Sequence, residues 1–508
     1  MADERLLHPT LSLCPVCREA IPARVIEEGG AAWMLKRCEA HGPSRVRLSP
    51  DAGWYERMRA EERVQAAPRH LRREIERGCP FDCGPCATHG QRTRLPIVTL
   101  TSACNLECPI CYVHNKSEDP FLMGREELAE ILRHLREEHA ELELLNFTGG
   151  EPTLHPDLLG MLQMAIDAGI RRVSICTNGI RLVQDEGLLD ALAAMGVRVA
   201  LSLQSYEPEV DRAMQGASLL DTKQRCLELL EAKEIDTTLI PVMTRGLNDH
   251  EIGRILAEGL RRPNVRHVEV HTMTFTGPGG AERDRGGRIS MLEVLERIEE
   301  ASGGTLRVEH FLPSPCAHPL CYQIAYLLID PEGGAPIPFL DFITPAEMRE
   351  VMSEHLYLEP SPRLEGLLRE AIDRLWAEGG QERTLSLLEG LLRRMFPRRP
   401  LERQASLAIA EQAVKAVYVH SHMDEETFDV ERLAQCCDCD VYEDGRHVPV
   451  CANNVLYRDK EARFMEKPRS WSEGRRGARQ LPILTSSQLE MRSPRLPGGT
   501  EPLGEEPA

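Results

Sequence analysis

The sequence predicts an α/β protein: a metal-binding module, a parallel sheet with covering helices, and a mostly helical, cysteine-bearing C-terminal region. Three observations predict this. Between about residues 94 and 285, short apolar segments alternate with longer helical patterns, which is typical of a parallel sheet. Residues 1–60 carry paired Cys and His residues around a glycine turn. The 17 cysteines are mostly clustered, which indicates metal binding rather than disulfides in a chain without an export signal.

The composition excludes several classes of protein. With 61 basic and 80 acidic residues, the 508-residue chain has a formal charge of −19, which disfavours nucleic acid as a partner. The first residues lack the basic and apolar regions of a signal peptide, and no apolar run approaches the roughly 18 residues of a spanning helix. We therefore expect a cytoplasmic protein.

The first 60 residues predict a rubredoxin-like or zinc-ribbon-like module. Cys14 and Cys17 form one knuckle, and Cys38 and His41 form a second, so that four ligands are offered to one tetrahedral metal. Residues 24–35 read as a hairpin with a Gly-Gly turn. The metal is either zinc or mononuclear iron, and His41 is either a ligand or a bystander.

Residues 61–93 are interpreted as a helical linker and a second cysteine segment. The spacing of apolar residues between 51 and 77 predicts one or two helices. Cys79, Cys83 and Cys86 then follow within eight residues, and we interpret them as part of an auxiliary cluster site. The alternative is a zinc site completed by His89.

Residues 94–285 are expected to alternate strands and helices. One predicted helix has Leu128, Ile131, Leu132 and Leu135 on one face, behind two acidic residues in its first turn. The six predicted strands are residues 95–100, 142–147, 173–177, 197–203, 237–242 and 265–272.

Two motifs at the ends of the first two strands carry the chemistry. Cys104, Cys108 and Cys111 have the spacing C-x3-C-x2-C, and a [4Fe-4S] cluster that normally takes four cysteines would keep one iron open here. A zinc knuckle or a disulfide cluster is disfavoured because no fourth ligand is local. The run 148–152, Thr-Gly-Gly-Glu-Pro, lets a ligand approach the backbone and offers a carboxylate to an ammonium group.

Residues 286–462 form the C-terminal region. A proline-rich loop carries Cys316 and Cys321, a strand is expected at 324–329, and residues 345–416 are mostly helical. One helix has a leucine stripe, Leu385 to Leu392, flanked by arginines; it either docks on its own domain or rests on a lipid surface. Residues 463–508 are expected to be a disordered tail. The last cysteines are Cys436, Cys437, Cys439 and Cys451.

The triplet and the Gly-Gly-Glu-Pro run together resemble the radical S-adenosylmethionine (SAM) enzymes. The resemblance implies a partial (β/α)6 barrel in which the three cysteines hold the cluster and SAM chelates its open iron. Electron transfer from a donor such as ferredoxin or flavodoxin would then generate a 5′-deoxyadenosyl radical. The SAM contacts that the resemblance implies are Tyr112, Gly149, Gly150, Glu151, Pro152, Asn178, Ser202 and Gln204.

The cysteine layout between about residues 10 and 458 resembles the archaeal tetraether lipid synthases and the methanopterin C-methylating radical SAM enzymes. The resemblance implies two auxiliary [4Fe-4S] clusters and leaves Cys439 over. Their eight thiols would be those of Cys79, Cys83, Cys86, Cys316, Cys321, Cys436, Cys437 and Cys451.

Three functions follow from this resemblance. The first is carbon–carbon bond formation at an unactivated carbon of a lipid-type substrate, with possible peripheral membrane contact. The second is C-methylation or methylene transfer on a pterin-like small molecule. The third, from another class, is a non-catalytic iron–sulfur electron carrier, which the Gly-Gly-Glu-Pro run disfavours because a carrier needs no ammonium-binding carboxylate.

Overall fold

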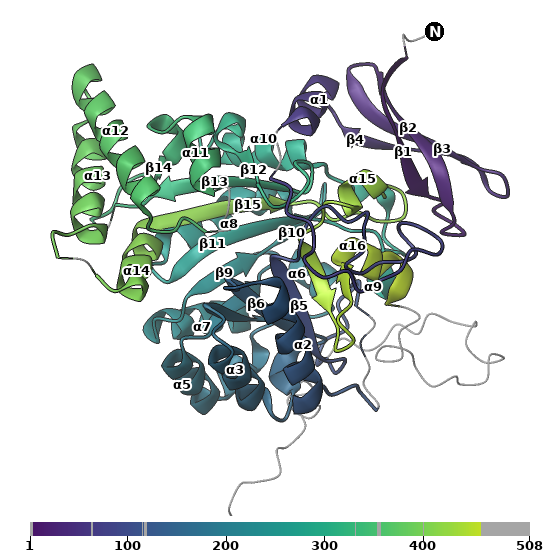
Figure 1. Ribbon diagram of the computed structural model, residues 1–508, viewed down its shortest axis with the longest axis horizontal. Helices are drawn as coiled ribbons and strands as arrows, with labels where there is room; N and C mark the ends of the chain where they lie inside the picture. Colours follow the sequence, from purple (N-terminus) through teal and green to yellow (C-terminus); the bar gives the residue numbers. More distant parts are fainter. Residues whose placement is uncertain are drawn as a thin grey trace, which may run out of the picture.

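The computed structural model describes residues 4–61, 64–113, 115, 119–330, 332–352, 357–399 and 401–458. Its N-terminal module is a four-stranded antiparallel sheet in the order β1-β2-β3-β4, which lies at one end of the molecule (Figure 1). Gly29 and Gly30 have φ values of 61° and 80°, so they form the tight turn of the predicted hairpin. The elements are β1 (Arg5–Leu13), β2 (Ala20–Glu28), β3 (Ala31–Cys38), β4 (Gly42–Ser49) and α1 (Ala52–Ala60).

All six predicted strands of the central region are present, and each pairs in parallel with its neighbours in the order β5-β6-β7-β8-β9-β11. The sheet does not close on itself within the described residues, so the predicted partial barrel is confirmed. The strands are β5 (Leu95–Thr101), β6 (Leu144–Gly149), β7 (Arg172–Thr177), β8 (Arg198–Ser202), β9 (Thr237–Ile240) and β11 (Val265–Thr272), with a short β10 (Val242–Met243) beside β11.

Helices cover the outer face of these strands, as Figure 1 shows for α2, α3, α5 and α7. In α2 (Arg125–Glu138) the predicted stripe Leu128, Ile131, Leu132 and Leu135 is buried, because these positions fall on one face of a 3.6-residue period. The other helices of this region are α3 (Leu158–Asp167), α4 (Ile180–Gln184), α5 (Glu186–Met195), α6 (Pro208–Gln215), α7 (Leu220–Ala232), α8 (Ile252–Arg261), α9 (Gly277–Gly280) and α10 (Met291–Ala301).

The C-terminal region extends the sheet at both edges. On one side β15 (Val414–His420) pairs in parallel with β11, and β13 (Tyr322–Leu328) pairs antiparallel with β15. On the other side β16 (Asp438–Val441) pairs in parallel with β5. Residues from beyond the central strands therefore help to line the interior of the barrel. The remaining strands are β12 (Leu312–Pro313), β14 (Ile337–Pro338) and β17 (His447–Pro449).

Four helices form a separate layer on β13 and β15, and their buried side chains make a second apolar core. Leu385, Leu388 and Leu391 of α13 are buried in this core, whereas Arg393 and Arg394 are exposed. The leucine stripe therefore docks on its own domain and is not available to a lipid surface. No helix in the described parts of the chain is long and apolar enough to cross a membrane. The helices are α11 (Pro345–Met352), α12 (Pro362–Glu378), α13 (Glu382–Met395) and α14 (Arg403–Ala413).

The helix expected beyond residue 61 is wrong for the described residues 64–77, which contain no helix. The apolar positions that suggested it are outside the core, with Val64 40% and Leu71 61% exposed. The segment is instead held by tertiary hydrogen bonds: the amides of Arg69 and His70 donate to the Glu138 carboxylate.

Two one-turn helices, α15 (Val430–Leu433) and α16 (Val450–Ala452), follow β15. The predicted disordered tail, 463–508, lies outside the described residues.

Candidate active site and metal centres

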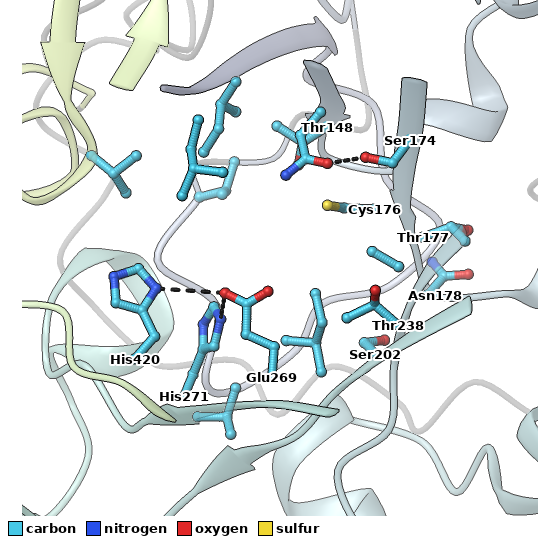
Figure 2. A pocket seen from close by; sticks show the side chains of 18 of the residues that line it. Thr148, Ser174, Cys176, Thr177, Asn178, Ser202, Thr238, Glu269, His271 and His420 are labelled. Carbon is cyan, nitrogen blue, oxygen red and sulfur yellow. Dashed lines mark hydrogen bonds and ion pairs between the residues drawn. The ribbon is translucent and has the colours of Figure 1, made fainter. Parts of the chain in front are cut away.

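A cavity of about 370 Å³ lies inside the barrel and extends to the carboxyl ends of the parallel strands, where active sites of parallel barrels are found. Its lining includes the thiols of the predicted triplet and polar residues from β6, β7, β8, β11 and β15. Figure 2 shows Glu269, His271 and His420 on one side of the cavity and Asn178 and Ser202 on the other.

The triplet occupies the loop that follows β5, and all three thiols line the cavity. Burial raises the pKa of each thiol, to about 12 for Cys108, so that free thiolates are disfavoured and a metal is needed to stabilise them. Three convergent thiols beside a cavity fit a [4Fe-4S] cluster that keeps one iron open.

A glycine segment that the sequence analysis did not single out supports this loop. The Gly279 amide donates to the Cys111 carbonyl over 3.0 Å. A Cβ atom at Gly279 would lie 2.8 Å from the Pro109 carbonyl oxygen, and one at Gly277 would overlap the Tyr112 backbone. The signal for this contact is the run 277–280, Gly-Pro-Gly-Gly, which follows β11, the last of the six central strands.

The two glycines of the second motif also allow close packing within the chain, and their expected role toward a ligand stays a prediction. A Cβ atom at Gly149 would overlap the Thr101 carbonyl, and one at Gly150 would overlap the Ala103 carbonyl. The Gly150 amide donates to Thr101 and the Glu151 amide donates to Ala103. The glycines thus allow the end of β6 to pack directly against the backbone that leads into the triplet.

The Glu151 carboxylate is 1% exposed and accepts four hydrogen bonds from its own chain. Its donors are the amide and hydroxyl of Thr153, the hydroxyl of Thr177 and the amide of Asn178, over 2.7–3.1 Å. Three of these bonds are to Oε1 and one is to Oε2, so Oε2 keeps an acceptor position. Its direct role toward an ammonium group remains a prediction, whereas its role in joining β6 to β7 is seen in the structure.

Seven of the eight expected SAM contacts line this one cavity, and Pro152, which begins a short 3-10 helix, does not. Cys176, which stands apart from the cysteine clusters in the sequence, also lines it. The seven residues are Tyr112, Gly149, Gly150, Glu151, Asn178, Ser202 and Gln204.

Lys223 was missed by the sequence analysis. Its side chain is 1% exposed, and its ammonium donates to the Asn178 carbonyl over 2.6 Å and to the Ser202 hydroxyl over 2.9 Å. Burial lowers its pKa. Lys223 therefore fixes two strand ends that carry expected SAM contacts. A lysine inside an amphipathic helix gave no signal of this role.

The N-terminal knuckles converge as predicted. One ligand atom from each of Cys14, Cys17, Cys38 and His41 lies within 4.8 Å of the others, and His41 Nδ1 is 3.6 Å from Cys14 and 3.5 Å from Cys38. Burial opposes ionisation of Cys14, but backbone amides of Cys17 and Val16 outweigh it and lower its pKa to about 6. His41 is thus placed as a ligand, and three sulfurs with one nitrogen fit tetrahedral zinc.

The remaining cysteines fall into two neighbourhoods. Cys79, Cys83 and Cys86 surround one small cavity, and Cys83 and Cys451 belong to one apolar cluster. Elsewhere Cys316 and Cys437 are 3.3 Å apart, and Cys321 accepts hydrogen bonds from Arg432.

Cys439 and His89 bear on the alternatives left open for these sites. Cys439 is buried on β16, where its thiol and burial together raise the pKa of Cys436 well above its usual range. His89 Nε2 hydrogen bonds to the Cys436 carbonyl over 2.8 Å, a contact that metal-binding imidazoles also make through their second nitrogen, so the zinc alternative stays open. The division of ligands between two auxiliary clusters stays a prediction.

Comparison with known proteins agrees with this geometry. Residues 98–258 match the radical SAM superfamily, and residues 6–49 match the HMPTM N-terminal zinc ribbon domain. Residues 98–258 thus form a radical SAM domain, and residues 6–49 form a zinc ribbon domain.

A particular relative covers nearly the whole chain. This is a 7,8-dihydro-6-hydroxymethylpterin dimethyltransferase from Methanocaldococcus jannaschii, 27% identical over 500 residues, which are 91% of this chain and 96% of the relative. A probable GTP 3′,8-cyclase from Saccharolobus solfataricus is 28% identical over 224 residues, 42% of this chain and 68% of that protein. Among solved structures, Streptococcus suis SuiB bound to its precursor peptide SuiA is matched with a TM-score of 0.34 and 16% identity, over 42% of this chain and 46% of that one.

Proposed function

We propose that the protein is a radical SAM enzyme that C-methylates a pterin-like heteroaromatic small molecule. The observation that carries this proposal is the polar wall of the cavity, formed by Glu269, His271, His420 and Tyr322. Glu269 pairs with His271 and Tyr322. The ring nitrogens left over on this wall would hydrogen bond to the edge of a heteroaromatic ring, because burying polar groups without partners is costly. The relative that aligns with 91% of this chain is a 7,8-dihydro-6-hydroxymethylpterin dimethyltransferase, which supports the same substrate class.

The residues of this chain would divide the work as follows. Cys104, Cys108 and Cys111 would hold the cluster, which with bound SAM supplies a 5′-deoxyadenosyl radical. Tyr112, Gln204 and the strand ends fixed by Glu151 and Lys223 would orient SAM in the cavity. Cluster reduction is assigned to a ferredoxin or flavodoxin. The auxiliary thiols would hold one or two further clusters beside the cavity.

One observation favours a second candidate, carbon–carbon bond formation in a lipid-type substrate. A second cavity of about 330 Å³ lies next to the first, and Ile324 lines both. Its lining is mainly apolar and includes Leu312, Phe339, Leu340, Met348 and Met352. An alkyl chain would fill this space, whereas a pterin would leave it empty.

The experiment supplies the anaerobically reconstituted full chain with reductant, SAM in excess, a one-carbon donor (a second SAM molecule or an added methylene carrier) and either a deuterated pterin or a deuterated lipid. We expect deuterium in 5′-deoxyadenosine, and a methylated product, only from the pterin. Label transfer from the lipid alone would reverse the order of the two candidates. Failure to cleave SAM under any condition, with iron fully loaded, would favour the electron carrier.

A further inference from the structure

Three imidazole rings meet at the carboxyl ends of β11 and β15, and one of them, His422, has its Nδ1 3.7 Å from the Cys451 thiol. His271 is the register partner of His420, and His422 follows two residues later. One nitrogen atom from each ring lies within 4.8 Å of those from the other two rings. The ring centroids of His271 are 5.1 Å from His420 and 5.3 Å from His422, and the latter two are 3.9 Å apart. All three rings line the main cavity.

A carboxylate lies behind two of these rings. Glu269 Oε1 is 3.0 Å from His271 Nε2 and 3.7 Å from His420 Nδ1 (Figure 2). The Tyr322 hydroxyl donates to the same oxygen over 3.4 Å, and its ring stacks on His420 with centroids 3.6 Å apart. Such an outer carboxylate orients metal-binding imidazoles and fixes their tautomers in many metalloproteins.

The cluster also contains an unsatisfied polar atom. His420 is 4% exposed, and its Nδ1 has no hydrogen-bond partner within the described part of the chain. An ordinary core histidine is usually satisfied at its buried nitrogens. Because His271 Nε2 and His420 Nδ1 face Glu269, and His422 Nδ1 faces the Cys451 thiol, the other nitrogen of each ring is the one left for a common ligand.

We propose that His271, His420 and His422 bind one divalent first-row transition metal ion inside the cavity, with Glu269 as the outer partner of two rings. Imidazole is a good ligand for zinc, iron and nickel. Three protein ligands are also the set that leaves a coordination position open to a small molecule.

The open position would face the same cavity as the triplet thiols. We assign the open coordination position of the metal to an oxygen or nitrogen atom on the edge of the pterin-like substrate, and this assignment rests on the proposed function. The metal would then fix the substrate relative to SAM. The competing explanation is that the three rings hydrogen bond to the substrate directly and bind no metal.

The test counts metal in the reconstituted full chain without substrate. After anaerobic equilibration with buffered zinc, elemental analysis should give about two zinc ions per chain, one of them in the N-terminal ribbon. The double variant His271→Asn/His420→Asn should keep about one zinc and the same iron content as the wild type. The unchanged iron content shows that the variant has folded and loaded its clusters.

His267→Asn is the matched control. His267 lies on the same strand and lines the same cavity, but it is not one of the three clustered rings. We expect it to keep about two zinc ions. If the double variant loads no clusters, the single variant His422→Asn replaces it, with at least a tenfold weaker second zinc site expected.

Zinc-edge X-ray absorption on a Cys14→Ser variant adds an independent readout, because the remaining zinc should show only nitrogen and oxygen neighbours. A wild type that saturates at one zinc, or an equal loss in His267→Asn, would overturn the proposal. Neither result depends on the substrate, so a failure of pterin methylation would leave this test of the metal site intact. Likewise, the absence of the second zinc ion would leave the test of pterin methylation intact.

Discussion

The Glu151 carboxylate accepts a 2.7 Å hydrogen bond from the Thr177 hydroxyl, which joins the carboxyl end of β6 to that of β7. The same carboxylate accepts from the Asn178 amide, directly before the turn into α4. Two neighbouring strand ends of the cavity are thus fixed by one buried acid.

The first prediction concerns this acid. Glu151→Ala removes four hydrogen bonds, and bonds to charged groups contribute about 1.5–3 kcal/mol each, so we expect a loss of at least about 3 kcal/mol in the free energy of unfolding. Glu151→Gln keeps an acceptor for three of the donors and should lose less. Anaerobic denaturation and SAM titration would measure both effects. A stable Glu151→Ala protein that only fails to bind SAM would show that the carboxylate contacts the ligand directly.

The second prediction concerns the triplet. Three [4Fe-4S] clusters hold about twelve irons, so Cys104→Ala, Cys108→Ala or Cys111→Ala should retain about eight while losing SAM cleavage. Iron analysis and 5′-deoxyadenosine measurement would check this. A fully loaded wild type with only about four irons would remove both auxiliary clusters.

The third prediction concerns the glycine that supports the triplet loop. In Gly279→Ala the new methyl group would press on the Pro109 carbonyl and the Cys111 backbone, so we expect loss of the SAM-binding cluster with the other iron retained. Gly366→Ala is the control: Gly366 lies within α12, with nothing within 4 Å of the added Cβ, and this change should stabilise the helix slightly. Normal cluster loading in Gly279→Ala would contradict the packing argument.

The fourth prediction concerns Lys223. Lys223→Met removes the donors to Asn178 and Ser202 but keeps the length of the side chain, and we expect about a tenfold rise in the SAM dissociation constant, equivalent to about 1.4 kcal/mol. Lys233→Met, at the end of the same helix in a pair with Asp190, should leave SAM binding unchanged. Equal effects of the two variants would indicate a general change in α7 instead.

The fifth prediction concerns the zinc ribbon. Backbone amides and the neighbouring thiols lower the pKa of Cys14 to about 6, whereas the pKa of Cys17 is raised, so Cys14 is the thiolate that this site keeps down to the lowest pH. The wild type should retain zinc at pH 7 and should begin to release it as the pH falls toward about 6. The Cys14→Ser variant should release zinc already at neutral pH. A zinc-sensitive dye would follow the release. Retention of zinc by Cys14→Ser at neutral pH would exclude Cys14 as a ligand.

The central strands were predictable because their apolar runs are long and each is bounded by polar turns. The cysteine triplet and the ribbon ligands were predictable because their spacing alone limits the chemistry. By contrast, residues 64–77 carry helix-like spacing that long-range contacts override: Glu138, almost 70 residues away, takes their amide hydrogen bonds. Local periodicity carries no information about such a partner.

The polar wall of the cavity was not predictable for a related reason. Glu269 and His271 alternate along β11, and His420 joins them only because β15 pairs with β11. About 150 residues separate these strands, so nothing local in the sequence shows that the three side chains meet. Lys223 was missed because a buried lysine and a solvated one look alike in a helical pattern.

The pairing of β16 with β5 also sets an order of events during synthesis. Strand β5 leads directly into the triplet loop, yet its edge partner β16 is translated more than 330 residues later. At about 5–20 residues per second, the ribosome needs roughly 20–70 s to supply that partner. For this interval a nascent chain carries the edge of β5 uncovered, next to the triplet loop. Chaperones and cluster-delivery factors therefore have a defined time window in which to act before the barrel edge is covered.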